Sequence, residues 1–308
     1  MESQLILQSD HFNLDFTLDC GQVFRWVKKE NWWVGVVEGN VIKIEQENKI
    51  ITIKSNSNII DEKFIKTYFR FDDQLKNIVS EISKDNYVTE AVSRYYGLRL
   101  LRQNPWECAA SFTCATYKNI NSIKLMISNI SRKFGKRIEF NGESYYSFPE
   151  PEIIANSDIN SLTDCGLGYR AKFLSELAKR IVSKEIVLEE LIDYDYHKAK
   201  SILLSKQLGK KFLIGIGPKV ADCILLFSLE KMDSFPIDVW IKRVVFKFYS
   251  HLFTNDSSIK NRVIINENNS IGFSEYENIS NTMRMYFGRY AGYAQEYLYH
   301  NMRVSSIS

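Results

Sequence analysis

The sequence predicts an α+β protein in which an antiparallel sheet comes first and helices follow. From Phe24 to Ile53 apolar and polar residues alternate, and turn signals recur at "EGN" and "QENK", as in an antiparallel meander with one face exposed to water. After about residue 58, apolar residues recur at spacings of three and four, which is the period of amphipathic helices. This order of elements favours a sheet domain with helices packed after it.

The composition is that of a globular protein. Of the 308 residues, 45% are hydrophobic, which is ample for a packed core, and the net charge of +3 permits nucleic acid as a partner without requiring it. The five cysteines show neither metal-ligand spacing nor a disulfide-dense pattern, which favours a reducing, cytoplasmic environment. No basic segment leads into an apolar run at the amino terminus, and no stretch approaches about eighteen uncharged apolar residues, so we expect neither secretion nor membrane insertion.

The segment "GIGPK" predicts a tight turn between two helices. The second helix begins at Pro218, whose missing N–H has no partner to lose at the first helical position. Gly215 and Gly217 allow a close approach to the backbone, and the amides at a helix N-terminus suit a phosphate oxygen. The turn is therefore a candidate contact with a DNA backbone, and the alternative is an ordinary packing corner between two helices.

Lys219 is a candidate nucleophile in the first turn of this second helix. The positive end of the helix dipole disfavours a cation there, and partial burial would lower the pKa further, so that a neutral amine becomes available. Cys223 lies four residues later on the same helix face. The alternative is a surface lysine above a core cysteine.

Asp238 follows "FPI" and precedes an apolar-periodic run, as a helix N-cap does. A carboxylate held at a helix start also stays ionised, and it can stabilise the positive charge that develops on a sugar when a glycosidic bond breaks. One aspartate could serve both purposes.

Six segments, in this order, resemble the 8-oxoguanine DNA glycosylase/AP lyases of the helix-hairpin-helix GPD superfamily. They are "CGQVFRW" (20–26), "GLRLLRQNPWECAASFTC" (97–114), "GLGYRAKF" (166–173), "GPKVADC" (217–223), "FPIDV" (235–239) and "YAGYAQEYLY" (290–299). The resemblance implies a twisted antiparallel sheet, similar to that of the TATA-binding protein, followed by two helical bundles with a helix-hairpin-helix motif. The implied domains are a sheet domain with flanking helices (1–96), a catalytic bundle (97–118 with 206–308) and a second bundle (119–205).

The resemblance also assigns roles to residues that would do the chemistry and hold the duplex. Lys219 matches the lysine that attacks C1′ of the damaged nucleotide and forms a Schiff base, and Asp238 matches the aspartate of the motif. Tyr169 and Arg170 match residues that wedge into the duplex and contact the estranged base. A structural cation would be held by backbone carbonyls of the hairpin, namely those of Lys211, Leu213 and Ile216.

Four further residues match the recognition of the damaged base. Gly21 matches the glycine whose carbonyl accepts the N7–H that separates 8-oxoguanine from guanine. Gln295 matches the residue on the Watson–Crick edge of the base, and Cys223 and Tyr299 match the pair that sandwich its ring. The alternative is that Gln295 lies at the edge of a stripe of core tyrosines, namely Tyr286, Tyr290, Tyr293 and Tyr297.

The chain departs from the best-known animal members of this family at several positions. Tyr117 stands where they have an asparagine that fills the gap left by the flipped base, and Ser122 stands where they have an arginine that reads the opposite cytosine. Only Arg170 remains of the three cytosine-reading residues, and Trp240 replaces a histidine near the phosphate. We therefore expect relaxed selectivity for the opposite base, with Tyr117 stacking in the vacated space.

These observations predict a bifunctional repair enzyme that flips 8-oxoguanine from double-stranded DNA, excises it through Lys219 and nicks the strand by β-elimination. One alternative is a glycosylase of the same superfamily for another base, such as an alkylated purine, but "CGQ" and "AQEYLY" argue against it. Another is a non-catalytic DNA-binding module, which would need neither Lys219 nor Asp238. We expect a monomer in the cytoplasm, at the nucleoid if the source is prokaryotic, and no iron–sulfur cluster, because no cysteine follows Cys223.

Overall fold

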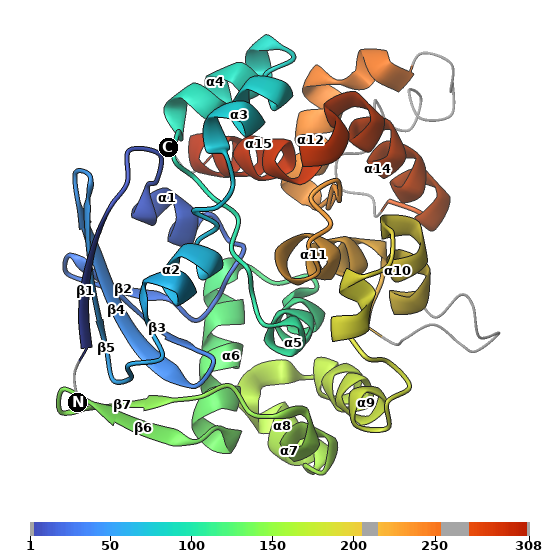
Figure 1. Ribbon diagram of the computed structural model, residues 1–308. Coiled ribbons are helices and arrows are strands. Elements are labelled where there is room, and N and C mark those ends of the chain that lie inside the picture. Colours follow the sequence, from blue (N-terminus) through green and yellow to red (C-terminus); the bar gives the residue numbers. More distant parts are fainter. Residues whose placement is uncertain (1–2, 205–214, 254–270, 307–308) are drawn as a thin grey trace.

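The computed structural model describes residues 3–204, 215–253 and 271–306, and it confirms the predicted α+β order. Five antiparallel strands form one sheet in the order β1-β5-β4-β3-β2 (Figure 1). Their bounds are β1 (Ser3–Gln8), β2 (Val27–Lys29), β3 (Trp32–Val37), β4 (Asn40–Glu47) and β5 (Ile50–Ser55). The edge strand β1 was not predicted from the sequence.

The turn residues explain the register of the meander. Val37 pairs with Asn40 across the loop Glu38-Gly39, and both loop residues have positive φ, 47° and 74°. A two-residue loop of this kind matches the right-handed twist of the strands it joins. The predicted turn at "EGN" is therefore confirmed.

One face of the sheet is buried and the other is covered only in part, so the expectation of one face exposed to water is confirmed in part: Gln4, Ile6 and Gln8 of β1 are exposed. Ile42, Ile44, Ile51 and Ile53 pack in the core beneath helices α1 (Leu14–Asp19) and α2 (Glu62–Tyr68). On the other face, Val34, Val36 and Val41 pack with Phe140 of a second, two-stranded sheet, β6 (Arg137–Phe140) and β7 (Glu143–Tyr146). This hairpin lies in a region that the sequence predicted to be mainly helical, and it comes from far along the chain.

The remaining elements are helical. The longer ones are α3 (Leu75–Ile82), α4 (Asn86–Arg94), α5 (Pro105–Ala115), α6 (Ile120–Phe134), α9 (Arg170–Val182), α10 (Tyr196–Leu203), α11 (Pro218–Ser228), α12 (Val239–Phe248), α14 (Phe273–Phe287) and α15 (Ala291–Ser305). The short ones are α7 (Pro151–Ala155), α8 (Ile159–Leu162), η1 (Thr163–Leu167), η2 (Glu189–Ile192), η4 (Ser250–Phe253) and η5 (Gly288–Tyr290). Within the described ranges, no helix combines the length and apolar character needed to cross a membrane.

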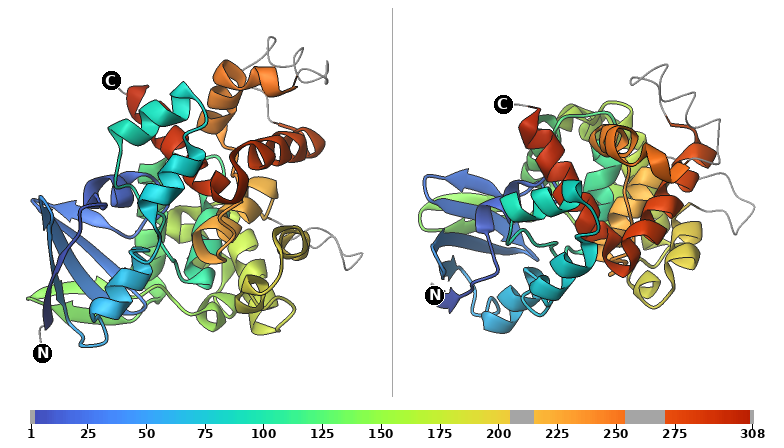
Figure 2. Two further views of the ribbon diagram at one scale, coloured as in Figure 1. Left: turned by 45° about the horizontal axis from the view of Figure 1, so that its top comes forward. Right: turned by 90° about the horizontal axis from the view of Figure 1, so that it is seen from above.

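The helices pack around two central ones, α5 and α11, which lie side by side (Figure 1). Most residues of both helices are buried in the largest core, which explains why their sequences are apolar on nearly every face. Helix α15 packs against α3, α4 and α12, so it joins the last part of the chain to helices from the first third. Further views show the five-stranded sheet on one side of the molecule and the helices on the other (Figure 2). The division of the chain into the three predicted domain ranges stays a prediction.

Candidate active site

The start of α11 has the backbone that the sequence predicted. Gly217 is the N-cap residue, with φ −87° and ψ 179°, and Pro218 occupies the first helical position. Gly215 has a φ of +99°, and a Cβ there would lie 2.7 Å from a side-chain carbon of Phe173, so glycine is required. Gly217 is exposed, a Cβ on it would meet nothing within 4 Å, and no side chain caps the helix. Its free space and uncapped first turn suit an approaching anion.

Lys219 is half-buried, and its side chain lies near two stacked aromatic rings. Its Nζ lies 5.0 Å from the ring centroid of Phe112, and that ring stacks on Phe227 with a centroid separation of 5.4 Å and an interplanar angle of 14°. Cys223, one turn further along α11, is buried. The amine therefore faces the protein interior rather than solvent, which argues against the alternative of a surface lysine.

The pKa of Lys219 differs from the sequence-based expectation. Burial alone lowers it, but the charges of Cys223 and Asp238 and a hydrogen bond to Cys223 raise it, and the result lies above the ordinary lysine value. Burial also raises the pKa of Cys223 to about 12, so Cys223 is a thiol at neutral pH, and the carboxylates that remain as partners of Lys219 are Asp238 and, more weakly, Glu296. The expectation that the pKa of Lys219 falls was wrong. It took account of the dipole of α11 but not of the carboxylate at the start of another helix. The resting amine is protonated and must lose a proton before it can attack.

Asp238 is the N-cap of α12, as predicted. Its Oδ1 accepts hydrogen bonds from the amides of Trp240 and Ile241, at 3.0 and 2.8 Å. Burial raises its pKa above the usual range, while these two amides and Lys219 act in the opposite direction. Asp238 is thus both a cap and the charged neighbour of Lys219.

Gly21 and Tyr299 lie together although they are at opposite ends of the chain. Gly21 has a φ of +100°, and a Cβ there would lie 3.2 Å from the Tyr299 hydroxyl oxygen. Gln295, four residues before Tyr299 on α15, is only 4% exposed, and its Oε1 has no hydrogen-bond partner among the described residues. Tyr293 and Tyr297 are core residues, so the predicted tyrosine stripe exists beside Gln295.

Two neighbours of these residues were missed by the sequence analysis. Gln22 is buried and anchors the loop that carries Gly21: its side-chain amide donates to the carbonyls of Thr17 (2.9 Å) and Arg99 (2.8 Å), and its Oε1 accepts from Leu101 (2.8 Å). Its only signal was its place in "CGQ".

Glu296 is the second. It is 2% exposed, and burial raises its pKa to about 7. A lone acidic residue within the largely apolar "YAGYAQEYLY" was the available signal. Electrostatic interactions join Lys219, Cys223, Asp238, Glu296 and Tyr299, Gly21 lies beside the Tyr299 hydroxyl, and Gln295 precedes Glu296 on α15. We call these residues the lysine cluster: Gly21, Lys219, Cys223, Asp238, Gln295, Glu296 and Tyr299.

The other predicted contacts with nucleic acid form a second group, which we call the tyrosine patch: Tyr117, Tyr169 and Arg170. The two tyrosines are 85% and 52% exposed, and Tyr117 has a φ of +55°. Arg170 is only 5% exposed: its Nε donates to the Thr116 carbonyl at 3.1 Å, and its Cζ lies 4.3 Å from the centre of the Tyr169 ring. Arg170 thus connects Tyr169 to Thr116, the residue before Tyr117, and its contact with an estranged base stays a prediction.

The remaining predicted positions are less informative. Ile216 is buried, whereas Lys211 and Leu213 lie outside the described residues, so the cation site stays a prediction. Trp240 is half-buried, with the Arg243 guanidinium 4.9 Å from its ring centroid. Within the part of the chain that the structure describes, no group of three or more His, Cys, Asp or Glu side chains could hold a metal.

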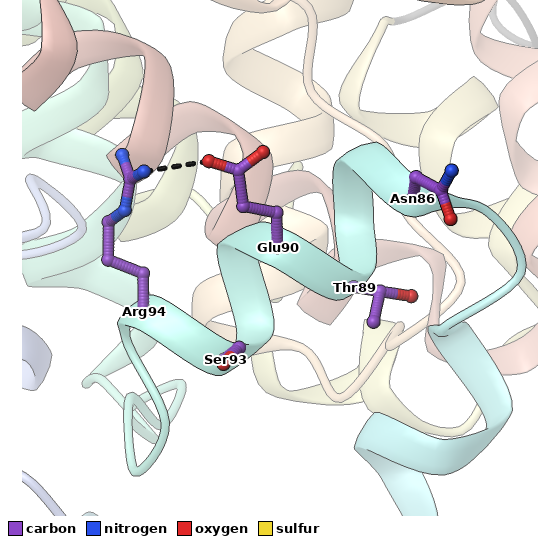
Figure 3. Close-up of a pocket in the computed structure, with 5 residues that line it drawn as sticks. All are labelled: Asn86, Thr89, Glu90, Ser93 and Arg94. Atoms are coloured by element: carbon purple, nitrogen blue, oxygen red, sulfur yellow. Dashed lines mark hydrogen bonds and ion pairs between the residues drawn. The ribbon is translucent and has the colours of Figure 1, made fainter.

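A surface hollow on α4 is not a candidate active site. It is lined by Asn86, Thr89, Glu90, Ser93 and Arg94 (Figure 3). Its two charged side chains, Glu90 and Arg94, pair with each other at 2.7 Å. It contains none of the candidate site residues, and its charges are already satisfied.

Comparisons with known proteins agree with this geometry. Residues 4–109 match the 8-oxoguanine DNA glycosylase N-terminal domain, and residues 118–262 match the HhH-GPD superfamily of base excision DNA repair proteins. The solved structure of MBOgg1 in complex with a low-affinity DNA ligand is 31% identical, with a TM-score of 0.84, over 98% of this chain and 96% of that chain. Clostridium acetobutylicum 8-oxoguanine glycosylase/lyase, solved with double-stranded DNA containing cytosine opposite 8-oxoG, is 28% identical, with a TM-score of 0.83, over 98% of each chain. The N-glycosylase/DNA lyase of Saccharomyces cerevisiae is 28% identical over 323 residues, covering 96% of this chain and 85% of the yeast protein.

Proposed function

The chain belongs to the 8-oxoguanine DNA glycosylases of the HhH-GPD superfamily, and from this premise we propose that it excises 8-oxoguanine through a Schiff base on Lys219. Its class is that of a DNA N-glycosylase and lyase that acts in base excision repair. The observation that carries the finer proposal is the half-buried Lys219 amine beside Asp238 and Cys223, on a helix whose first turn is open to an anion. A non-catalytic module would gain nothing from burying an amine and a carboxylate together.

The damaged nucleotide leaves the duplex, because its C1′ and base edges are inaccessible in the stack. The Gly21 carbonyl accepts the N7–H of 8-oxoguanine, and the unpartnered Gln295 Oε1 accepts a hydrogen bond from the Watson–Crick edge. Cys223 and Tyr299 flank the ring. The positive φ of Gly21 and its closeness to the Tyr299 hydroxyl support this assignment, since any larger residue at 21 would be strained.

The chemistry follows from the two ionisable groups at the starts of α11 and α12. The neutral Lys219 amine attacks C1′, the bond from C1′ to N9 breaks, and its electron pair leaves with the base. The Asp238 carboxylate stabilises the positive charge on the sugar, and its two backbone amides hold it in place. The nitrogen bound to C1′ then loses a proton, the C1′–O4′ bond breaks, and O4′ leaves as the C4′ hydroxyl, which gives the protonated Schiff base. Loss of a C2′ proton from this Schiff base expels the 3′ phosphate, which nicks the strand.

The tyrosine patch supports contact with the opposite strand. Exposed aromatic faces stack on any base, whereas guanidinium groups distinguish bases by hydrogen bonds. Arg170 already donates to the Thr116 carbonyl, and Ser122 lies in the first turn of α6, where its amide bonds to Asn119. We therefore propose that the enzyme excises the lesion with little selectivity for the opposite base. We also propose that it contains no iron–sulfur cluster and acts as a monomer.

Borohydride trapping tests substrate and mechanism together. Wild-type protein should form a covalent adduct with a duplex containing 8-oxoguanine, and Lys219→Gln should form none while still binding the duplex. Lys179→Gln, the same change at an exposed lysine on α9, is the matched control and should trap normally. Adducts on a duplex with an alkylated purine instead would favour the alternative substrate. Trapping by Lys219→Gln would move the nucleophile elsewhere.

A further inference from the structure

Glu296 is a buried acid that the reaction described so far does not use. It lies on α15 next to Gln295 and contacts the thiol of Cys20, which precedes Gly21. Its Oε1 is buried without a hydrogen-bond partner among the described residues. Burying a carboxyl group in this way is unfavourable, so its position calls for a functional reason.

The reaction lacks an acceptor for one proton. The Lys219 ammonium must become an amine before it attacks, and the ionisable groups that interact with it most strongly are Cys223, Asp238 and Glu296. Cys223 is a thiol at neutral pH, so it already carries its proton and cannot accept another. The Oδ1 of Asp238 holds two backbone amides, and its charge is needed opposite the sugar. Of these three groups, only Glu296 has a buried oxygen, Oε1, without a hydrogen-bond partner among the described residues.

We propose that Glu296 accepts the proton of the Lys219 ammonium through a bridging water and thereby delivers the neutral nucleophile. The N–H bond of Lys219 breaks and an O–H bond forms on Glu296, so an ammonium and a carboxylate become an amine and a carboxylic acid. The freed lone pair then attacks C1′. Glu296 acts through Lys219 and does not touch the substrate, so it is a positioning residue, and this role rests on the proposed Schiff base.

The surroundings of Glu296 suit a group that gains a proton near neutral pH. Burial and the charge of Asp238 on α12 raise its pKa, and Cys20, Arg303 of the same helix and Lys219 on α11 lower it, with the result at about 7. Tyr299 also faces it, but its own pKa lies far too high for it to titrate there. Transfer from Lys219 to Glu296 removes two opposite charges at once, and the Asp238 carboxylate that remains is stabilised by two backbone amides.

The test is the pH profile of single-turnover excision from a duplex containing 8-oxoguanine. Wild-type enzyme should speed up with pH to a plateau above about 7. Glu296→Gln should be slower by roughly 100-fold or more at pH 7.5 and should gain about tenfold per pH unit, because its amine must lose the proton unaided. Glu296→Asp keeps the carboxylate and should retain the plateau at a reduced rate. Glu107→Gln, at a carboxyl that pairs with Arg25 at 3.0 Å, is the control and should follow the wild-type profile.

Two outcomes overturn the proposal. If Glu296→Gln equals or exceeds wild type at pH 7.5, the carboxylate only raises the pKa of Lys219. If its profile keeps the plateau, another group takes the proton. Borohydride trapping at pH 9.5 distinguishes a failure of this proton transfer from a failure of the Schiff base itself. Glu296→Gln should still form the adduct at that pH. If the wild type forms no adduct at any pH, there is no Schiff base, and Glu296 does not have this role. Thermal unfolding of each variant checks that it is folded. If Glu296→Gln does not fold, the plateau in the pH profile of Glu296→Asp provides the test.

Discussion

The lysine cluster and the tyrosine patch use opposite physical means. The cluster buries ionisable groups, among them Lys219, Asp238 and Glu296, so each charge there is set by its neighbours. The patch exposes two tyrosine rings and buries its one charged side chain, Arg170, against the Tyr169 ring and the Thr116 carbonyl. The cluster is suited to chemistry, which needs tuned proton affinities, and the patch to binding, which needs accessible surface. Changes in the first should alter rates, and changes in the second should alter affinity.

The largest effect is expected for Asp238→Asn. Asparagine still caps a helix but carries no charge for the developing cation, so excision should slow by about 100- to 1000-fold with little loss of stability. Single-turnover excision and urea unfolding measure the two quantities. Asp195→Asn, at the N-cap of α10 where the side chain accepts from Lys198 at 2.9 Å, is the matched control and should excise normally. An unchanged rate would leave Asp238 as a cap alone.

Glu296→Gln should make the protein more stable at pH 8. The folded pKa of Glu296 is about 7 against 4.5 for the free side chain, so its contribution to stability is intact below about pH 4.5 and is lost as pH rises through 7. The wild type loses roughly 3 kcal/mol of its free energy of unfolding over this whole pH range. A glutamine side chain does not titrate, so Glu296→Gln does not lose it. Urea unfolding at pH 5 and pH 8 should show the gap between variant and wild type widening with pH. A constant gap would mean that Glu296 does not titrate in this range.

Replacing the exposed tyrosines should weaken binding without slowing the chemistry. Tyr117→Ala and Tyr169→Ala should each reduce duplex affinity by about 1–3 kcal/mol, because stacking on a base is lost. Excision at saturating enzyme should stay near the wild-type rate. Tyr87→Ala, at another exposed tyrosine on α4, is the control for affinity. A large fall in the saturated rate would instead assign the patch a part in the chemical step.

The smallest effect is expected for the base opposite the lesion. Arg170 is engaged with Thr116, and the other two cytosine-reading positions are Tyr117 and Ser122, so a cytosine preference below about tenfold should remain. Single-turnover excision from four duplexes that differ only in that base measures it. A preference of about a thousandfold would show that other residues read the cytosine.

Much of the local structure was predictable from the sequence. The turn at Glu38 and Gly39, the helix start at Pro218 and the cap at Asp238 all depend on residues within a few positions of one another. The motif segments also identified which residues of the lysine cluster to consider. The hairpin β6–β7 and its packing over part of the second face of the sheet were not predicted, because the apolar residues that pack together there are distant in sequence.

By itself, the sequence determined the order of the elements, the turns, the caps and the family, since these depend on local backbone preferences and on short motifs. Only the tertiary structure decided how the ionisable groups behave. The sign of the pKa shift of Lys219 depends on Asp238 at the start of another helix. The pKa of Glu296 is raised by burial and lowered by a hydrogen bond with Cys20 from the first part of the chain. A pKa reflects every charge and every solvent-excluding atom within several ångströms, and these arrive from segments that no local pattern brings together.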